Sequence, residues 1–165
     1  MRVKGHVLIR EAVAPDADGI VECLRGAFEP FRASYTAQAF SDTVPTREEI
    51  ERRLSSMQVY VAVTETDQVV GTIACTLMNR DEGHIRGMAV DRTRQGSGIA
   101  TQLLGAAEAT LIARGCSRVT LDTTAPLERA VRFYERNGFQ ATGRVTDFFG
   151  MPLYEYAKPL NCSPL

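Results

Sequence analysis

The sequence predicts a single α/β domain in which helices flank a mixed central β-sheet. Segments with apolar residues at helical spacing alternate along the chain with short segments rich in β-branched residues, which are typical of strands. The 165 residues suit one domain, and no repeat, linker or low-complexity tract divides them. We therefore expect residues 1–165 to form one domain.

The first third of the chain is predicted to contain one strand and two helices. Residues 6–12 are apolar and β-branched, as in a strand. Ala14-Pro15-Asp16 is a helix start, and Pro30 ends that helix. Residues 30–45 show no clean period and are predicted to be a loop or a short-helix insert. Thr46 opens a capping box and a second helix through about residue 56.

The middle of the chain is predicted to contain a hairpin, a further strand and a long helix. Residues 59–63 and 69–77 are strand-like and are joined by a turn at Asp67-Gln68. Residues 82–90 form the next predicted strand. A helix that closes at Gly115 is indicated by apolar residues at every fourth position, namely Ile99, Leu103, Ala107 and Leu111.

The last third of the chain supplies the remaining elements. Val119, Leu121 and Thr123 alternate as in a strand. Pro126 opens a helix that ends at Asn137-Gly138. Residues 139–145 and 153–157 are predicted to be the last pair of strands. The predicted order is β-α-α-β-β-β-α-β-α-β-β, a mixed sheet flanked by helices.

Composition and charge argue against several classes of partner. The 19 Lys and Arg residues are balanced by 20 Asp and Glu residues, so net charge does not support a nucleic-acid or membrane-surface partner. No uncharged apolar run approaches the length of a membrane span, and the run Val7-Leu8-Ile9 is too short for a signal-peptide core. We expect a cytoplasmic protein that binds neither nucleic acid nor membrane.

Cysteine and histidine are sparse and scattered. With two histidines, His6 and His84, and no C-x-x-C pair, the pattern of a metal site is missing, and we expect no metal. The four cysteines are expected to be reduced thiols, at positions 23, 75, 116 and 162.

The most informative segment is VDRTRQGSGIA at residues 90–100, which leads from a strand end through two glycines into a helix. A helix start leaves backbone N–H groups without intrahelical partners, and glycines let a bulky anion approach them, so the segment suits a phosphate. It lacks the third glycine of a dinucleotide fingerprint and the Gly-Lys-Ser/Thr of a P-loop. An ordinary glycine-containing loop would look the same locally.

A second segment, AVRFYERNGF at residues 130–139, distinguishes these alternatives. Alone, Tyr134 would be interpreted as a core aromatic on a helix. Together with Gln95-x-x-Gly98-x-Ala100 upstream, the segment resembles the two signatures of the GCN5-related N-acetyltransferase (GNAT) superfamily, in the family's order and separation. The resemblance covers about residues 59–139. It implies a GNAT-like acyl-CoA-binding fold and an N-acetyltransferase domain over residues 1–165.

The resemblance implies acetyl-CoA as the co-substrate. The backbone of Met88, Ala89 and Val90 would line the pantetheine, and the N–H of Met88 would polarise the thioester carbonyl. The pyrophosphate would be held by the glycine turn and the helix start, that is by Arg94, Gln95, Gly96, Ser97, Gly98, Ile99, Ala100 and Thr101.

The resemblance also implies direct attack by a primary amine on the thioester. Tyr134 would act as the general acid, because a phenol of pKa about 10 is close to a thiol of pKa about 8.5. The base would be Glu82 or His84, although a solvated turn explains both residues equally well. Family members often carry an asparagine where this chain has Leu127. Its cofactor contact would then fall to Thr123, Thr124 or Arg129.

The acceptor remains open at this point. Aromatic and charged side chains of the insert and the last strands suit a small-molecule amine or a peptide N-terminus, namely Phe28, Phe31, Arg32, Tyr35, Phe40, Asp42, Phe148, Phe149 and Tyr154. The main hypothesis is an N-acetyltransferase. The alternatives are a non-catalytic acyl-CoA-binding sensor or regulatory module, and an α/β domain that binds another nucleotide. A homodimer is left open.

Overall fold

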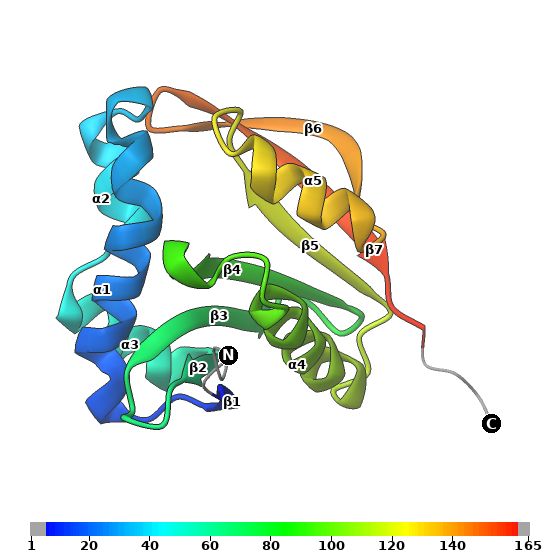
Figure 1. Ribbon diagram of the computed structural model, residues 1–165. Helices are drawn as coiled ribbons and strands as arrows, with labels where there is room; N and C mark the ends of the chain where they lie inside the picture. The colour runs from blue at the N-terminus through cyan, green and yellow to red at the C-terminus, as the bar shows by residue number, and fades with distance from the viewer. Residues whose placement is uncertain (1–5, 162–165) are drawn as a thin grey trace.

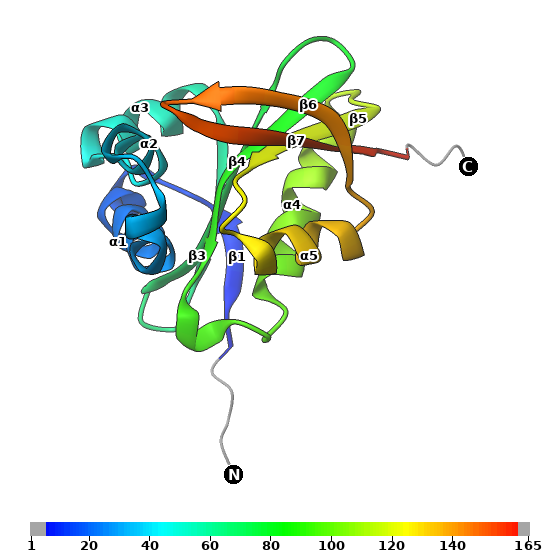
Figure 2. The same cartoon turned by 90° about the horizontal axis from the view of Figure 1, so that it is seen from above.

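The computed structural model describes residues 6–161 as a seven-stranded mixed sheet with helices on both faces (Figures 1 and 2). The strands are β1 (Leu8–Glu11), β2 (Gln58–Val63), β3 (Val69–Leu77), β4 (Glu82–Val90), β5 (Arg118–Thr123), β6 (Gln140–Phe148) and β7 (Met151–Pro159). The helices are α1 (Ala17–Phe28), α2 (Ala37–Thr43), α3 (Arg47–Ser56), α4 (Ile99–Ala113) and α5 (Glu128–Arg136). Short 3₁₀ turns are η1 (Ala14–Asp16), η2 (Glu29–Ser34) and η3 (Arg92–Arg94). The predicted fold class is confirmed.

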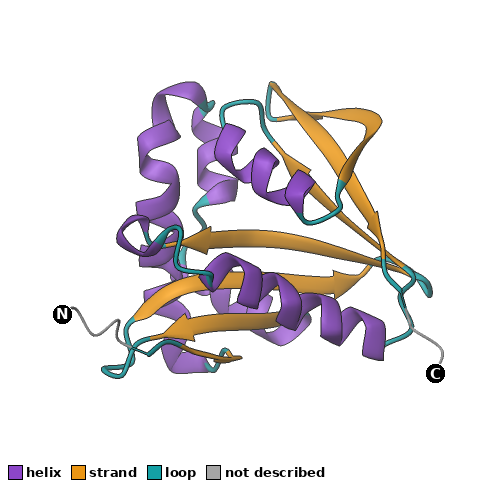
Figure 3. Cartoon of the chain, turned by 45° about the vertical axis from the view of Figure 1, so that its right-hand side comes forward, coloured by secondary structure: helices purple, strands orange, loops and turns teal. Residues whose placement is uncertain are grey.

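The sheet has the strand order β1-β2-β3-β4-β5-β7-β6. Only the β4–β5 pair is parallel, and α4 makes the crossover that a parallel pair requires. The last strand, β7, lies between β5 and β6 instead of at the edge. Figure 3 shows β5, β7 and β6 as a group that diverges from β4.

Two cores hold the layers together. On one face of the sheet, Ile20 and Leu24 of α1 and Ile50 of α3 pack against the β2 strand, with each of these side chains at most 1% exposed. On the other face, Leu103 and Leu111 of α4 pack against β3 and β4. Figure 2 shows α1, α2 and α3 on one side of the sheet and α4 and α5 on the other. Each helix buries its apolar face, as the helical spacing predicts.

Most predicted elements are confirmed, and the last hairpin needs a correction. The Thr46 hydroxyl accepts a hydrogen bond from the Glu49 N–H at 3.3 Å and caps α3, and the insert before it folds into η2 and α2. The last hairpin is tighter than predicted, because β6 and β7 extend to a turn at Phe149 and Gly150. Both turn residues have positive φ, 51° and 90°, which fits a two-residue hairpin turn.

A bulge in β4 prepares the site. Thr72 of β3 pairs with Ala89, whereas Ala74 pairs with Arg86, so β4 carries one extra residue at this point. Gly87 takes a φ of +61° there, which favours glycine. The extra residue changes the alternation of side chains. Ala89 packs on the α1 and α3 face, while Met88 packs on the α4 face.

Beyond the bulge, β4 and β5 separate. Their paired register runs from Glu82–Arg118 to Ile85–Leu121 and stops there. The two strands then diverge, as Figures 1 and 3 show. The split leaves backbone of both strands available to a ligand.

The structure also bears on the predictions for the cysteines, for membrane spans and for metal sites. The thiols of Cys23 and Cys75 are buried, which raises their pKa to about 12 and about 11, whereas Cys162 lies outside the described residues. Within residues 6–161, no helix has both the length and the apolar character needed to cross a bilayer. The same residues contain no group of three or more His, Cys, Asp or Glu side chains placed to hold a metal ion.

Candidate functional site

Two cavities adjoin where β4 and β5 separate. The larger one, of about 560 Å³, extends from the glycine turn between α1 and α5, and we call it the turn cavity. The smaller one, of about 280 Å³, lies between α1, α3 and the β4–β5 strands, and we call it the sheet cavity. The two cavities have four lining residues in common, Phe28, Met88, Leu127 and Tyr134. The cavities therefore meet at a shared wall.

The glycine turn has the geometry of an anion site. Gly96 and Gly98 have φ of +83° and +87°, a left-handed conformation that glycine adopts readily. The Gln102 N–H donates the first hydrogen bond of α4, to the Gly98 carbonyl at 3.1 Å. The N–H groups of Ile99, Ala100 and Thr101 precede that bond and point out of the helix start, which suits a phosphate.

The cofactor residues predicted from the sequence lie together, with one exception. Residues that line the turn cavity are Met88, Ala89, Val90, Arg94, Gln95, Gly96, Gly98, Ile99, Ala100 and Thr101. Ser97 does not line the cavity, because its hydroxyl donates to the Arg94 carbonyl and closes the turn. The structure thus brings together the residues of the predicted site, while their role in binding stays a prediction.

The turn cavity also contains cationic residues that the sequence reasoning missed. Arg92 and Arg136 line it beside Arg94 and Arg129. Arg136 lies in the last turn of α5, and nothing in the linear sequence places that turn next to the glycine turn. Four arginines that line one cavity suit a ligand with several phosphate charges.

The split between the strands holds an unsatisfied hydroxyl. Among residues 6–161, the Thr123 Oγ1 is the one buried side-chain polar atom without a hydrogen-bond partner. The neighbouring Thr124 hydroxyl is already paired with the Tyr35 hydroxyl at 2.7 Å. Of the two threonines that could replace the asparagine that is Leu127 here, Thr123 is therefore better placed to hydrogen-bond a ligand in the split. Arg129, the third candidate, lines the turn cavity.

Tyr134 of α5 lies at the shared wall. Its hydroxyl donates to the Met88 Sδ at 3.8 Å, and its ring packs edge-on against Phe133 and Phe139. Burial raises the pKa of Tyr134 to about 12, so the phenol is protonated at neutral pH. The sequence alone suggested a phenol with its ordinary pKa of about 10. For the buried phenol, complete transfer of its proton to a thiolate of pKa about 8.5 is unfavourable by about 5 kcal/mol, unless the thiolate is desolvated as well.

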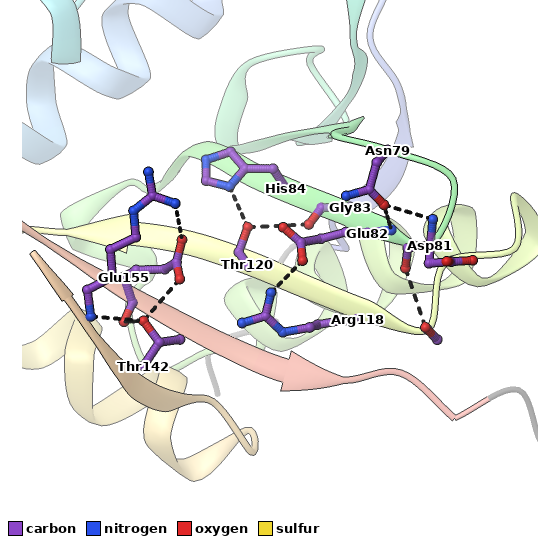
Figure 4. A network of polar contacts seen from close by, with 11 residues as sticks. Asn79, Asp81, Glu82, Gly83, His84, Arg118, Thr120, Thr142 and Glu155 are labelled. Carbon is purple, nitrogen blue, oxygen red and sulfur yellow. Dashed lines mark hydrogen bonds and ion pairs between the residues drawn. The ribbon is translucent and has the colours of Figure 1, made fainter. Parts of the chain in front are cut away.

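His84 and Glu82 occupy different environments (Figure 4). Glu82 forms an ion pair with Arg118 and does not line the sheet cavity. The His84 ring does line it, with Nδ1 at 2.8 Å from the Thr120 hydroxyl and Nε2 at 3.6 Å from the Asp122 carboxylate.

Thr120 and Asp122 contact the two ring nitrogens of His84. The Thr120 hydroxyl lies 2.8 Å from the His84 Nδ1 and 3.5 Å from the Gly83 carbonyl, and it can donate to either. Burial lowers the pKa of His84, opposed by Asp122, whose own pKa burial raises. His84 therefore lies as a neutral imidazole beside a carboxylate. Asp122 was not predicted from the sequence as part of the site.

The predicted acceptor wall forms in part. Phe28, Tyr35, Asp42 and Phe148 line the sheet cavity. The remaining residues of the prediction lie elsewhere. Phe31 lines the turn cavity and Tyr154 a separate hollow, the Arg32 guanidinium lies over the Phe40 ring at 4.2 Å, and Phe149 is exposed in the last hairpin turn. The sheet cavity is also lined by Arg53 and Arg86, which were not predicted from the sequence.

The fold and the two cavities define an α/β domain with an anion-binding helix start beside a split in its sheet. The chain belongs to the acetyltransferase (GNAT) family, because the sequence model of that family matches residues 20–139. Membership replaces the hypothesis of a domain that binds another nucleotide.

Relatives of known name agree with this family. The chain is 33% identical over 79 residues to N-alpha-acetyltransferase 30 of Schizosaccharomyces pombe, a match that covers 46% of this chain and 53% of that protein. The chain thus spans about half the length of this curated relative.

Solved structures show the same fold. A GNAT acetyltransferase from Staphylococcus aureus Mu50 superposes with a TM-score of 0.78 at 21% identity, covering 94% of this chain and 100% of that one. The PaiA N-acetyltransferase from Thermoplasma acidophilum, in complex with coenzyme A, gives 0.77 at 16% identity, covering 93% and 99%. Ard1 from Thermoplasma volcanium gives 0.72 at 22% identity, covering 94% and 98%.

Proposed function

We propose that residues 1–165 form a single-domain N-acetyltransferase that moves an acetyl group from acetyl-CoA to a primary amine while both substrates are bound. The observation that carries the proposal is the shared wall, because Tyr134 and Met88 lie where a donor in the turn cavity would meet an acceptor in the sheet cavity. Two substrates held at one junction can react with each other directly.

Acetyl-CoA would supply an activated acetyl thioester. The helix-start N–H groups and the arginines of the turn cavity suit its phosphates. The backbone from Met88 to Val90 and the Thr123 hydroxyl suit its pantetheine arm, because the split leaves this part of β4 without a register partner on β5 and leaves the Thr123 hydroxyl without a hydrogen-bond partner.

His84 is the base that we propose. A primary amine of pKa about 10.4 is neutral in about one molecule per thousand at pH 7, which costs about 4 kcal/mol. His84 lies in the sheet cavity, where its neutral imidazole would take the amine proton and the Asp122 carboxylate would stabilise the imidazolium that results. Glu82 is a weaker candidate because Arg118 already holds its carboxylate.

Tyr134 is the acid that we propose, in the form of a hydrogen-bond donor to the departing sulfur. Its raised pKa keeps the proton on the phenol until negative charge develops nearby. The Met88 N–H lies in the bulge and has no register partner on β3, so it can donate to the carbonyl oxygen of the acetyl group.

The test is release of free thiol from acetyl-CoA by the full chain, measured across amino acids, polyamines, aminoglycosides and peptide N-termini. We expect thiol release with at least one class and none without an amine. Calorimetric binding of coenzyme A with no thiol release from any class would favour the alternative, a non-catalytic acyl-CoA-binding sensor or regulatory module.

A further inference from the structure

The sheet cavity is charged on two sides, and the charges differ in sign. Facing β5 are the Asp122 carboxylate and the imidazole of His84. Facing α3 are the guanidinium groups of Arg53 and Arg86. An amine without an anionic group would make no favourable charge interaction with Arg53 and Arg86.

Arg53 is a half-buried cation on α3 without an ion pair among the described residues. Its Nη1 lies 2.6 Å from the place where a Cβ on Gly87 would stand, so the bulge glycine makes room for it. Burial and the nearby Arg86 cation lower the pKa of Arg53 to about 10, although the more distant Asp42 and Glu49 carboxylates oppose the shift. A cation held under these conditions is stabilised when an anion arrives.

Arg86 does not relieve this excess of positive charge. It is paired with Asp42 at 3.5 Å, and both side chains are 43% exposed, which makes a weak pair. Among the residues that line the cavity on its α3 side, Arg53 and Arg86 thus face one carboxylate, that of Asp42. A ligand carboxylate would restore the balance.

The positions also fit a small ligand. His84 and Arg86 are two residues apart on the same face of β4, which separates them by about 7 Å. The cavity of about 280 Å³ has room for a molecule of amino-acid size. We propose that the acceptor is a small primary amine that also carries a carboxylate. Its carboxylate binds Arg53, assisted by Arg86, while its amine lies beside His84 and Asp122.

This inference rests on the proposed function, and its test separates the two. Thiol release is measured with matched acceptors that differ only in the anion, such as leucine, leucinamide and isoamylamine, with parallel sets built on alanine, phenylalanine and glutamate. A further arm compares β-alanine with 2-aminoethylphosphonate, which distinguishes a carboxylate from a phosphonate. Each acceptor is tested with the wild type, Arg53→Met and Arg53→Lys.

We expect kcat/KM for the preferred amino acid to fall by about 10- to 100-fold in Arg53→Met, because a charge-assisted pair is lost. The value for the matching amide should change less than about threefold. Arg53→Lys should recover part of the loss, since it keeps the charge without the planar fork. Arg52→Met is the matched control, since Arg52 is exposed on the same helix and outside both cavities. It should leave both values unchanged.

Two results would overturn the inference while the proposed function stands. One is a wild type that acetylates the amides or isoamylamine as well as the amino acids. The other is an Arg53→Met variant that slows every acceptor equally. If no amine releases thiol, calorimetric titration of the amino acids into coenzyme A-bound protein still decides the carboxylate site. Binding that weakens in Arg53→Met but not in Arg52→Met supports it, and binding of none of them rejects it.

Discussion

The Tyr134 hydroxyl donates a hydrogen bond to the Met88 sulfur, 3.8 Å away, at the wall that the turn cavity and the sheet cavity share. A thioether sulfur is a weak acceptor, so this contact costs little to give up. The phenol is therefore held in position with its proton available for a better acceptor, which the proposed function identifies as the departing thiolate.

Replacement of Tyr134 by Phe should lower kcat by about 100-fold and leave the affinity for acetyl-CoA nearly unchanged, because only the donated proton is lost. Stopped-flow thiol release and calorimetric titration measure the two effects. Tyr60→Phe is the control, since the Tyr60 hydroxyl pairs with Thr110 away from both cavities. An unchanged kcat in Tyr134→Phe would remove the acid role.

The pH profile should report His84. Its pKa lies below the ordinary value of 6.5, so kcat/KM should rise with pH along an acidic limb below that value. Asp122 is the main influence that raises this pKa, so Asp122→Asn should lower it further and move the limb to lower pH. His84→Gln should abolish the limb and slow the reaction by about 100-fold.

The same profiles discriminate between the two candidate bases. Glu82→Gln should keep the acidic limb of the wild type, because Glu82 is paired with Arg118 outside the sheet cavity. A limb that disappears in Glu82→Gln and persists in His84→Gln would assign the base to Glu82 instead.

Gly98→Ala should reduce both stability and the affinity for acetyl-CoA. A φ of +87° strains any residue with a Cβ, so we expect a loss of about 1 to 2 kcal/mol in the free energy of unfolding. Relief of that strain would displace the N–H groups at the helix start. Gly105→Ala in the middle of α4 is the matched control, because no atom lies within 4 Å of its added Cβ.

The control should stabilise the protein by about 0.5 to 1 kcal/mol, as alanine does in an exposed helix, with no change in affinity. Denaturant unfolding and calorimetric titration of both variants give the comparison. Equal affinity for acetyl-CoA in Gly98→Ala would contradict the assignment of the turn as the phosphate site.

Replacement of Asp16, which lies far from the site, should lower the stability of the protein. Its carboxylate accepts from the Arg10 guanidinium at 2.7 and 3.0 Å and from the Val13 N–H at 2.8 Å, and the Arg10 hydrogen bond lowers its pKa. Asp16→Asn should cost about 1 to 3 kcal/mol at pH 7.

The sign of the pH dependence follows from that lowered pKa. The ionised carboxylate contributes fully above the unfolded value of 3.8, and the contribution is lost as pH falls through the lower folded value. The unfolding curves of wild type and variant, measured by urea titration from pH 7 to pH 2.5, should therefore converge in acid. A constant difference over that range would show that the charge is irrelevant.

The sequence predicted best what depends on near neighbours in the chain. Residues 82–90 were predicted as a strand and are β4, and the glycine turn has the left-handed residues that its spacing indicates. The last hairpin was predicted with ends several residues short, because Phe149 is an unusual residue at positive φ.

The sheet cavity depends on long-range pairing and was predicted only in part. Asp122 meets His84 because β5 pairs in parallel with β4, and Arg53 enters because the bulge puts a glycine beneath it. Strand order and bulge position have no local signal in one sequence. Thr123 became a candidate only when its hydroxyl proved to have no partner.

The place of β7 between β5 and β6 has a consequence for synthesis of the chain. Strand β5 acquires its second neighbour only from residues 151–159. Until those residues leave the ribosome, one edge of β5 presents unpaired N–H and C=O groups to other chains. The residues of the turn cavity, all before residue 137, are made earlier. A nascent chain can therefore hold the elements for the donor while its exposed strand edge is still open to aggregation.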